Sequence, residues 1–97
     1  MGIVWSEKEM ESLAQRIKAM GSPIRLSIIC LLAEGEMPVQ QICRELGSTQ
    51  PNISQHLSVL FNQGLLQSRK EANWVYYSIA DQQLKTVLEM VREIYCH

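Results

Sequence analysis

Apolar residues at helical spacing predict two helices in the first third of the chain. Between Ser6 and Met20 they recur at steps of three and four residues, the pattern of an amphipathic helix. Ser22 and Pro23 then supply an N-cap and a proline at the first helical position, for a helix of about Pro23 to Ala33. This second helix is apolar nearly all round. We therefore expect it at the centre of the fold, with part of its cover coming from a second subunit.

Two further helices follow a turn at Glu34 to Pro38. The first of them, Val39 to Leu46, stops at Gly47, and the second begins at about Thr49 and continues to Gly64. Two helices joined by a tight turn that contains glycine are typical of a helix-turn-helix.

The pattern then changes from helical spacing to alternation. Residues Leu65 to Ile79 alternate around the polar tip Arg69 to Asn73, which predicts a two-stranded hairpin. A last amphipathic helix is predicted at about Asp81 to Tyr95. This order predicts a mainly α fold with a small β-hairpin, a winged helix-turn-helix, in a single domain over residues 1–97.

Length and composition exclude several classes of protein. A chain of 97 residues has room for one compact core, and no stretch approaches the run of about 20 apolar residues that crosses a bilayer. The N-terminal segment lacks the pattern of a secretory signal, so we expect a cytoplasmic protein with no membrane contact. An enzyme is the least favoured class, because the sequence has neither a glycine-rich phosphate loop nor paired histidines for a catalytic metal.

Charge is distributed unevenly along the chain. The formal net charge is -1, whereas a DNA-binding domain usually carries a basic balance. No Asp or Glu occurs between Glu45 and Glu71, however, while His56, Arg69 and Lys70 lie in that window. We therefore expect one locally positive surface on a chain that is acidic overall.

Hydrogen-bonding side chains line the outward face of the predicted helix from Thr49 to Asn62. Asn and Gln side chains pair with adenine in the major groove, and Ser or Thr hydroxyls reach base edges or phosphates. The alternative for the helix is a solvated polar face, and the alternative for the hairpin tip is an ordinary polar turn. For His56 the alternative is a structural hydrogen bond in the same helix. The predicted contacts with double-stranded DNA are Thr49, Gln50, Asn52, Ser54, Gln55, His56 and Ser58 on the helix, with Arg69, Lys70 and Asn73 at the hairpin tip.

The sequence resembles the ArsR/SmtB family of bacterial repressors. The matching segments are Met20-Gly21-Ser22-Pro23-Ile24-Arg25-Leu26, Gln50-Pro51-Asn52-Ile53-Ser54-Gln55-His56-Leu57-Ser58-Val59-Leu60, Gly64-Leu65-Leu66 and Trp74-Val75-Tyr76-Tyr77-Ser78-Ile79. The resemblance implies a winged-helix homodimer built on the first and last helices. It also implies that the dimer binds an imperfect inverted repeat and is released when an inducer arrives.

The metal sites that are usual in that family are not matched. Its thiolate site needs cysteines where this chain has Pro38 and Gln40, and its zinc site on the last helix needs a histidine where Asp81-Gln82-Gln83 stands. Proline has no ligand group, and an amide binds Zn(II) poorly. No metal site and no cofactor are predicted.

The sequence has three cysteines. Cys30 and Cys96 resemble the pair found in the subgroup of the family that senses persulfides and oxidants, in which the two cysteines of one subunit become linked directly or through extra sulfur atoms. That resemblance implies reactive sulfur species or an oxidant as the inducer. Cys30 lies in an apolar helix and is expected to be the less reactive of the two, and Cys43, at helical spacing from Val39 and Leu46, is expected in the core.

Two other interpretations remain open at this point. In the first, the inducer is a soft metal or metalloid held by Cys30, Cys43 or Cys96 together with His97. In the second, the winged helix is a protein-interaction module, which would account for the missing net basicity.

Overall fold

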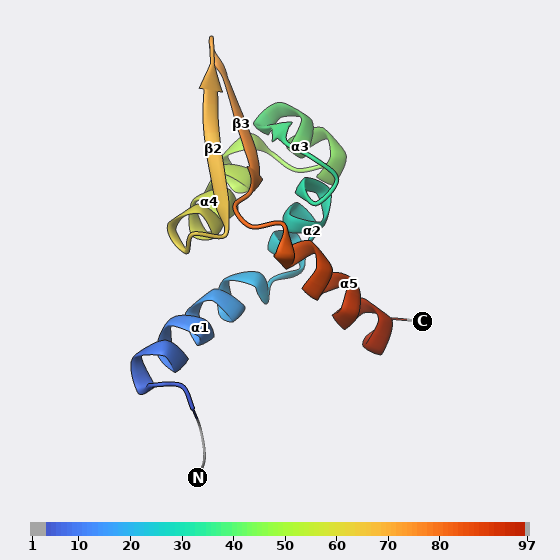
Figure 1. Cartoon of the computed structure of the whole chain (residues 1–97). Helices are drawn as coiled ribbons and strands as arrows, with labels where there is room; N and C mark the ends of the chain where they lie inside the picture. The colour runs from blue at the N-terminus through green and yellow to red at the C-terminus, as the bar shows by residue number, and fades with distance from the viewer. Residues whose placement is uncertain (1–3, 97) are drawn as a thin grey trace.

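The computed structural model describes residues 4–96, so residues 1–3 and His97, a ligand only in the soft-metal interpretation, lie outside it. Within the described range the predicted helices and hairpin are confirmed. The elements are α1 (Glu7–Met20), α2 (Pro23–Leu32), β1 (Met37–Pro38), α3 (Val39–Leu46), α4 (Gln50–Asn62), β2 (Leu66–Glu71), β3 (Trp74–Ile79) and α5 (Gln83–Tyr95). Figure 1 shows the long hairpin of β2 and β3 on one side of the helices, with α1 and α5 extending away on the other.

Local capping contacts set the helix boundaries that the sequence predicts. The hydroxyl oxygens of Ser6, Ser22 and Thr49 each accept a hydrogen bond from the backbone N–H three residues later, at 3.1, 3.4 and 3.4 Å. Each hydroxyl satisfies a backbone donor that has no partner inside the helix. At the other end of α3, Gly47 adopts a left-handed conformation with φ 61° and turns the chain towards α4.

The sheet has one strand more than the sequence predicts. Met37 and Pro38, expected as part of a turn, form β1 and pair antiparallel with Tyr77 and Tyr76 of β3. The strand order is therefore β1-β3-β2, and the sheet is three-stranded. Two residues are too few to show an alternating pattern. Pro38 is tolerated because β1 is an edge strand, where one side of the backbone has no hydrogen-bonding neighbour.

The hydrophobic core surrounds α2, as predicted. Side chains from α2, α3 and α4 fill it, and the sheet closes one side through Leu66 and Ile79. Leu84 and Leu88 attach the first half of α5 to this core. The fully buried side chains are Ile28, Ile29, Leu32, Ile42, Ile53, Leu57 and Leu60. Because α2 and α3 share this core with α4, tight packing fixes the position of α4 on the body of the protein.

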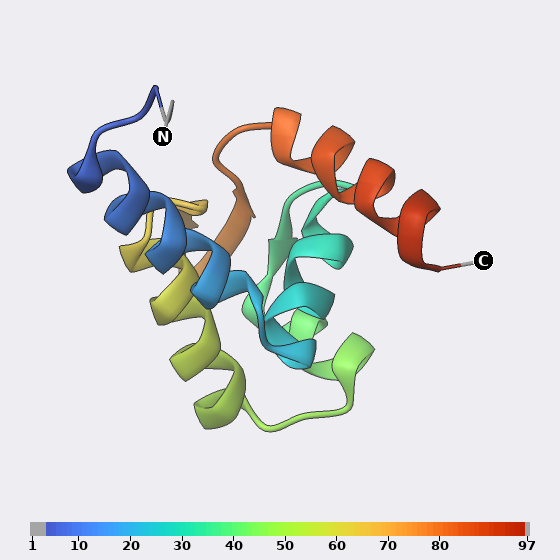
Figure 2. The ribbon, with the colours of Figure 1, turned by 90° about the horizontal axis from the view of Figure 1, so that it is seen from below.

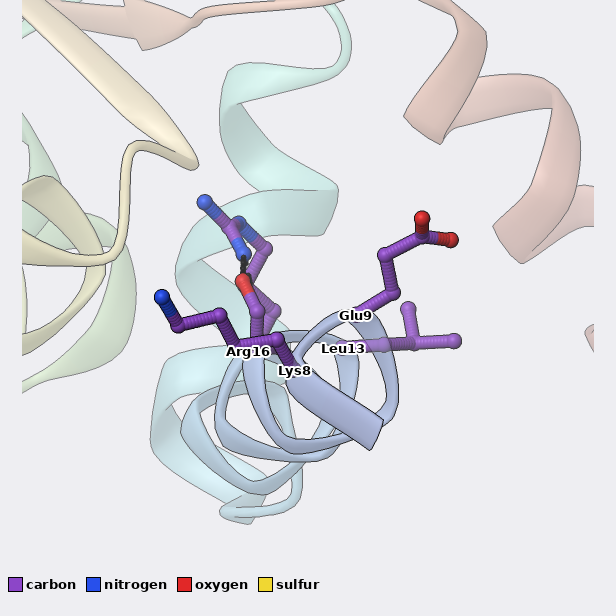
Figure 3. A pocket seen from close by; sticks show the side chains of 5 residues that line it. Lys8, Glu9, Leu13 and Arg16 are labelled. Carbon is purple, nitrogen blue, oxygen red and sulfur yellow. Dashed lines mark hydrogen bonds between the residues drawn. The ribbon is translucent and has the colours of Figure 1, made fainter. Parts of the chain in front are cut away.

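The terminal helices leave apolar side chains uncovered. No residue of α5 is fully buried in the described chain, and Val87 and Ile94 keep 51% and 62% of their surfaces exposed. On α1, Leu13 and Ile17 are also exposed. Figure 3 shows the solvent-exposed pocket on α1, where Leu13 lies among Lys8, Glu9, Ser12 and Arg16. Figure 2 shows α1 and α5 on different flanks of the molecule, so these two helices do not cover each other.

The turn at the end of the hairpin contains a strained residue. Ala72 has φ 54°, a left-handed conformation that glycine adopts at much lower cost. We expect Ala72→Gly to raise the free energy of unfolding by about 1 kcal/mol. Gly64 is the matched control, because it has φ 74° and open space around an added Cβ, so Gly64→Ala should lower stability by about 1 kcal/mol or more. Urea unfolding at one fixed protein concentration measures the free energy of unfolding of both variants. If the Ala72→Gly protein were no more stable than the parent, Ala72 would not be strained.

Candidate nucleic-acid interface

The turn between α3 and α4 fixes the direction of the second helix. After Gly47, the N–H of Ser48 donates to the carbonyl oxygen of Cys43 at 3.1 Å, and α4 begins two residues later. Ile53 and Leu57 are buried on one side of α4. At about 100° per residue, Gln55 and Ser58 must then lie on the opposite side of the helix. The helix-turn-helix therefore presents a polar face to solvent.

The structure brings the predicted helix residues together on this face. Thr49, Gln50, Asn52, Gln55 and Ser58 are exposed, and Ser54 and His56 are half-buried at its flanks. The Asn52 side-chain amide donates to the Ser48 hydroxyl oxygen at 2.9 Å. The face carries no Asp, Glu, Lys or Arg side chain between Thr49 and Asn62. Amide and hydroxyl groups are therefore its main hydrogen-bonding chemistry.

His56 differs from these residues because its partner lies on another helix. Its Nδ1 lies 3.2 Å from Nη1 of Arg25, a residue of α2 that also donates from Nε to the carbonyl oxygen of Ala19 at 2.6 Å. The alternative for His56 was a hydrogen bond in its own helix, but the partner in the structure, Arg25, belongs to α2. A contact between residues 31 positions apart leaves no periodic signal in a sequence.

The hairpin carries less free positive charge than the sequence predicts. Arg69 is bound by Glu36, with Nε to Oε2 at 2.9 Å and Nη2 to Oε1 at 2.5 Å, and by Glu71 at 2.6 Å. Its guanidinium also lies over the Tyr76 ring, 4.4 Å from the centroid. The absence of Asp and Glu between Glu45 and Glu71 predicted a locally positive surface that includes Arg69. This is wrong for Arg69, because its charge is paired with Glu36, from the loop before β1, and with Glu71, at the end of the acid-free segment.

Mutual hydrogen bonding shifts the titration of this ion pair. The hydrogen bond from Arg69 lowers the pKa of the Glu36 carboxyl most, desolvation raises it by less, and the positive charge of Arg69 lowers it further. Hydrogen bonds to Glu36 and then to Glu71 raise the pKa of Arg69. A lowered carboxyl pKa means that the pair is complete above the ordinary Glu value of about 4.3 and is lost only as pH falls through the lower folded value. Near neutral pH all three groups are therefore charged, and Arg69 forms ion pairs on the exposed surface, where such pairs contribute little stability.

Lys70 and Asn73 lie at the exposed end of the hairpin, together with Trp74, which is 46% exposed. Among residues 4–96, no carboxylate lies within ion-pair distance of Lys70. Lys70 is therefore the predicted hairpin cation that remains free to meet an external anion.

The three cysteines occupy different environments, and all are free thiols. Cys43 is half-buried against the core, which confirms the prediction for it. Cys30 lies in the apolar helix α2, as predicted, but its side chain is exposed because that helix has an open side in the single chain. Within residues 4–96, Cys30 and Cys96 are not joined by a disulfide. Cys96 is exposed directly after α5, and in Figure 1 this end of the chain projects away from the core.

Residues 4–96 hold no group of three or more His, Cys, Asp or Glu side chains placed to bind a metal ion. Over the same range, no helix has the length and apolar character of a membrane span.

A glycine-ended helix pair with an exposed polar second helix, followed by an antiparallel hairpin, defines a winged helix-turn-helix DNA-binding protein. Residues 22–68 match the family described as "Bacterial regulatory protein, arsR family". The transcriptional activator HlyU of Vibrio cholerae is 33% identical over 96 residues, which cover 99% of this chain and 89% of HlyU. The chain therefore belongs to the ArsR family of transcriptional regulators; it is a DNA-binding regulator and not an enzyme. Family membership thus favours DNA binding over the interpretation of the winged helix as a protein-interaction module.

Solved structures of relatives share the whole fold. HlyU of Vibrio cholerae superposes with a TM-score of 0.84 at 34% identity, covering 95% of this chain and all of that one, and a second structure is described as reduced HlyU. The transcriptional repressor BigR of Xylella fastidiosa has a TM-score of 0.81 at 27% identity and coverage of 96% and 99%. Mb0332 of Mycobacterium bovis, described as a homodimeric winged helix-turn-helix DNA-binding domain, has a TM-score of 0.83 at 29% identity, covering 97% of this chain and 89% of Mb0332.

Proposed function

We propose that this protein is a dimeric transcriptional repressor that leaves its operator when Cys30 and Cys96 become linked by a disulfide or polysulfide bridge. The observation that carries the proposal is the accessibility of both thiols on a protein that also exposes a polar recognition helix. The name of BigR, a repressor, supports repression, although HlyU is named an activator. The description of one HlyU structure as reduced supports a redox-dependent state in the family.

In this proposal the N-terminal half of α4 enters the major groove. Gln50, Asn52 and Gln55 hydrogen-bond base edges there, and the Thr49, Ser54 and Ser58 hydroxyls serve bases or phosphates. Lys70 and Asn73 contact the backbone beside the groove. Arg69 joins them only when a phosphate replaces Glu36 as its partner, because the guanidinium is already held by two carboxylates.

The homodimer is proposed to form through α1 and α5. Their exposed apolar faces lack cover in the single chain, and Mb0332 is described as homodimeric. A two-fold dimer places two copies of α4 about one duplex turn apart. The operator is therefore an imperfect inverted repeat, and its affinity depends on the spacing of the two recognition helices.

The proposed signal is an exchange reaction at sulfur. The thiolate of one cysteine attacks a sulfur atom of a polysulfide, an S–S bond breaks, and the shortened polysulfide leaves with the electron pair. The resulting persulfide is attacked at its cysteine-bound sulfur by the second thiolate, which forms the disulfide and releases hydrosulfide. Two thiols thus lose two protons and two electrons, and the electrons reduce one polysulfide sulfur to sulfide.

A link between these positions changes the DNA-binding geometry through the dimer. Cys30 belongs to α2, which packs on α4, and Cys96 follows α5 of the proposed interface. A covalent connection ties the end of α5 to α2 and so moves one recognition helix relative to the other. A displacement that breaks the one-turn spacing removes one half-site from the contact.

Single cysteine variants test this function. Cys30→Ser and Cys96→Ser proteins should bind the operator as the parent does but should stay bound after treatment with polysulfide, because one thiol alone closes no bridge. Cys43→Ser is the matched control and should be released normally. Fluorescence anisotropy of labelled operator DNA, before and after polysulfide treatment, measures operator binding by the parent and the three variants. Release of both test variants at the parent's polysulfide concentration would rule out the pair as the sensor.

Mass spectrometry separates this proposal from induction by a soft metal, for which the accessible thiols are equally suited. Treated protein should show added sulfur or the loss of two hydrogens per subunit. Retained arsenic or cadmium in protein released by those ions, with no such change after polysulfide, would favour the metal instead.

A further inference from the structure

Arg25 joins three helices at the centre of the DNA-binding unit. Its Nε donates to the backbone carbonyl of Ala19 in the last turn of α1, and its Nη1 lies 3.2 Å from Nδ1 of His56 in the middle of α4. Arg25 itself is half-buried in the first turn of α2. One guanidinium therefore connects a helix of the proposed dimer interface to the recognition helix.

A hydrogen bond between these two nitrogens requires one particular tautomer of His56. A guanidinium has five N–H donors and no acceptor, so Nδ1 must supply the lone pair and carry no hydrogen. In the neutral imidazole the hydrogen then lies on Nε2, on the far side of the ring. Arg25 thus selects the tautomer that has a hydrogen-bond donor on the side away from α2.

We infer that Arg25 is a positioning residue for operator recognition, which fixes the Nε2–H tautomer and the orientation of His56 and ties α4 to the end of α1. The inference rests on the proposed function and on His56 as one of the operator contacts that the sequence predicts, and it adds a residue that need not touch DNA. Because Arg25 is held by Ala19 of α1 as well, a shift of α1 at the dimer interface reaches His56 through the same guanidinium.

Nitrogen NMR of the free protein directly tests whether His56 has the Nε2–H tautomer. At pH 8, where an ordinary imidazole is neutral, long-range ¹H–¹⁵N spectra of the parent should show unprotonated Nδ1 and protonated Nε2 for His56. In Arg25→Gln the two tautomers should become mixed. Protonated Nδ1 in the parent would overturn the inference even if every Arg25 variant failed to fold.

A double-mutant cycle on operator affinity tests the second part. A hydrogen bond to a charged group is lost in Arg25→Gln, so we expect binding weakened by about tenfold. If Arg25 acts through His56, adding this change to His56→Ala should cost less than about twofold more. Arg25→Lys keeps the positive charge and one donor group, so it should bind the operator more tightly than Arg25→Gln does. Arg92→Gln on α5 is the control for the loss of an arginine charge.

The outcomes separate the two proposals. Fully additive losses from Arg25→Gln and His56→Ala would overturn the positioning role. Operator binding unchanged in His56→Ala would overturn the proposed base or phosphate contact of His56, while the NMR measurement still decides whether Arg25 sets its tautomer. Thermal unfolding of each variant shows which losses of binding accompany a loss of fold.

Discussion

Replacing Gln55 by alanine is expected to weaken operator binding by about 100-fold. Gln55 lies opposite the buried Ile53 and Leu57 on α4, in the half of the helix that enters the groove. A side chain that pairs with a base edge contributes about 1–3 kcal/mol of discrimination, and a dimer loses that contact twice. Anisotropy titration with an operator and with a base-substituted operator gives both the affinity and the lost discrimination.

Asn62 supplies a closely matched control. It lies seven residues later, on the same side of α4, and is also an exposed amide, but it is at the C-terminal end of the helix. Asn62→Ala should change operator affinity by less than about threefold, which is under 1 kcal/mol. A larger loss for Asn62→Ala than for Gln55→Ala would mean that the opposite end of α4 faces the DNA.

Replacing Val87 by aspartate is expected to abolish the dimer and to lower operator affinity by 100-fold or more. Val87 is 51% exposed at the middle of the apolar side of α5, together with Val91 and Ile94. Burying an unpaired carboxylate between apolar surfaces costs several kcal/mol. A monomer then binds one half-site without the gain from the second. Analytical ultracentrifugation and operator titration measure the two effects.

Glu89→Gln is the control for this change. Glu89 is two residues along and points away from the apolar side of the helix, so its substitution should leave both the dimer and the operator affinity unchanged. If Val87→Asp also left the protein dimeric, the second copy would have to be bound by a surface other than this face of α5.

Local signals in the sequence account for most of the fold. The Ser22 cap and the end of α3 at Gly47 are short-range features, and the structure has both where the sequence predicts them. Ser6 and Thr49 stand at the predicted starts of their helices and are also N-caps in the structure. The strand at Met37–Pro38 could not be predicted in the same way, because its pairing partner Tyr77 is far along the chain. Tertiary pairing, and not local preference, makes those two residues a strand.

The candidate site also combines features that local sequence predicts with features that depend on tertiary packing. The polar face of α4 follows from helical spacing alone, so its members were predictable. The ion pair between Glu36 and Arg69 and the contact between Arg25 and His56 depend on how separate elements pack. Counting charges along the sequence therefore overestimated the positive charge of the hairpin. The exposure of Cys30 also depends on packing, because an apolar helix in a single chain can leave one side for a partner.

Peptide mapping of polysulfide-treated protein tests the sensing claim most directly. Trypsin alone leaves Cys30 and Cys43 in one peptide, whereas additional cleavage after Glu34 and Glu93 places Cys30, Cys43 and Cys96 in three separate peptides. Protein collected after release from the operator should contain the Cys30 peptide joined to the Cys96 peptide, directly or through added sulfur, with Cys43 free. Released protein in which Cys30 and Cys96 both remain as unmodified thiols would contradict the account.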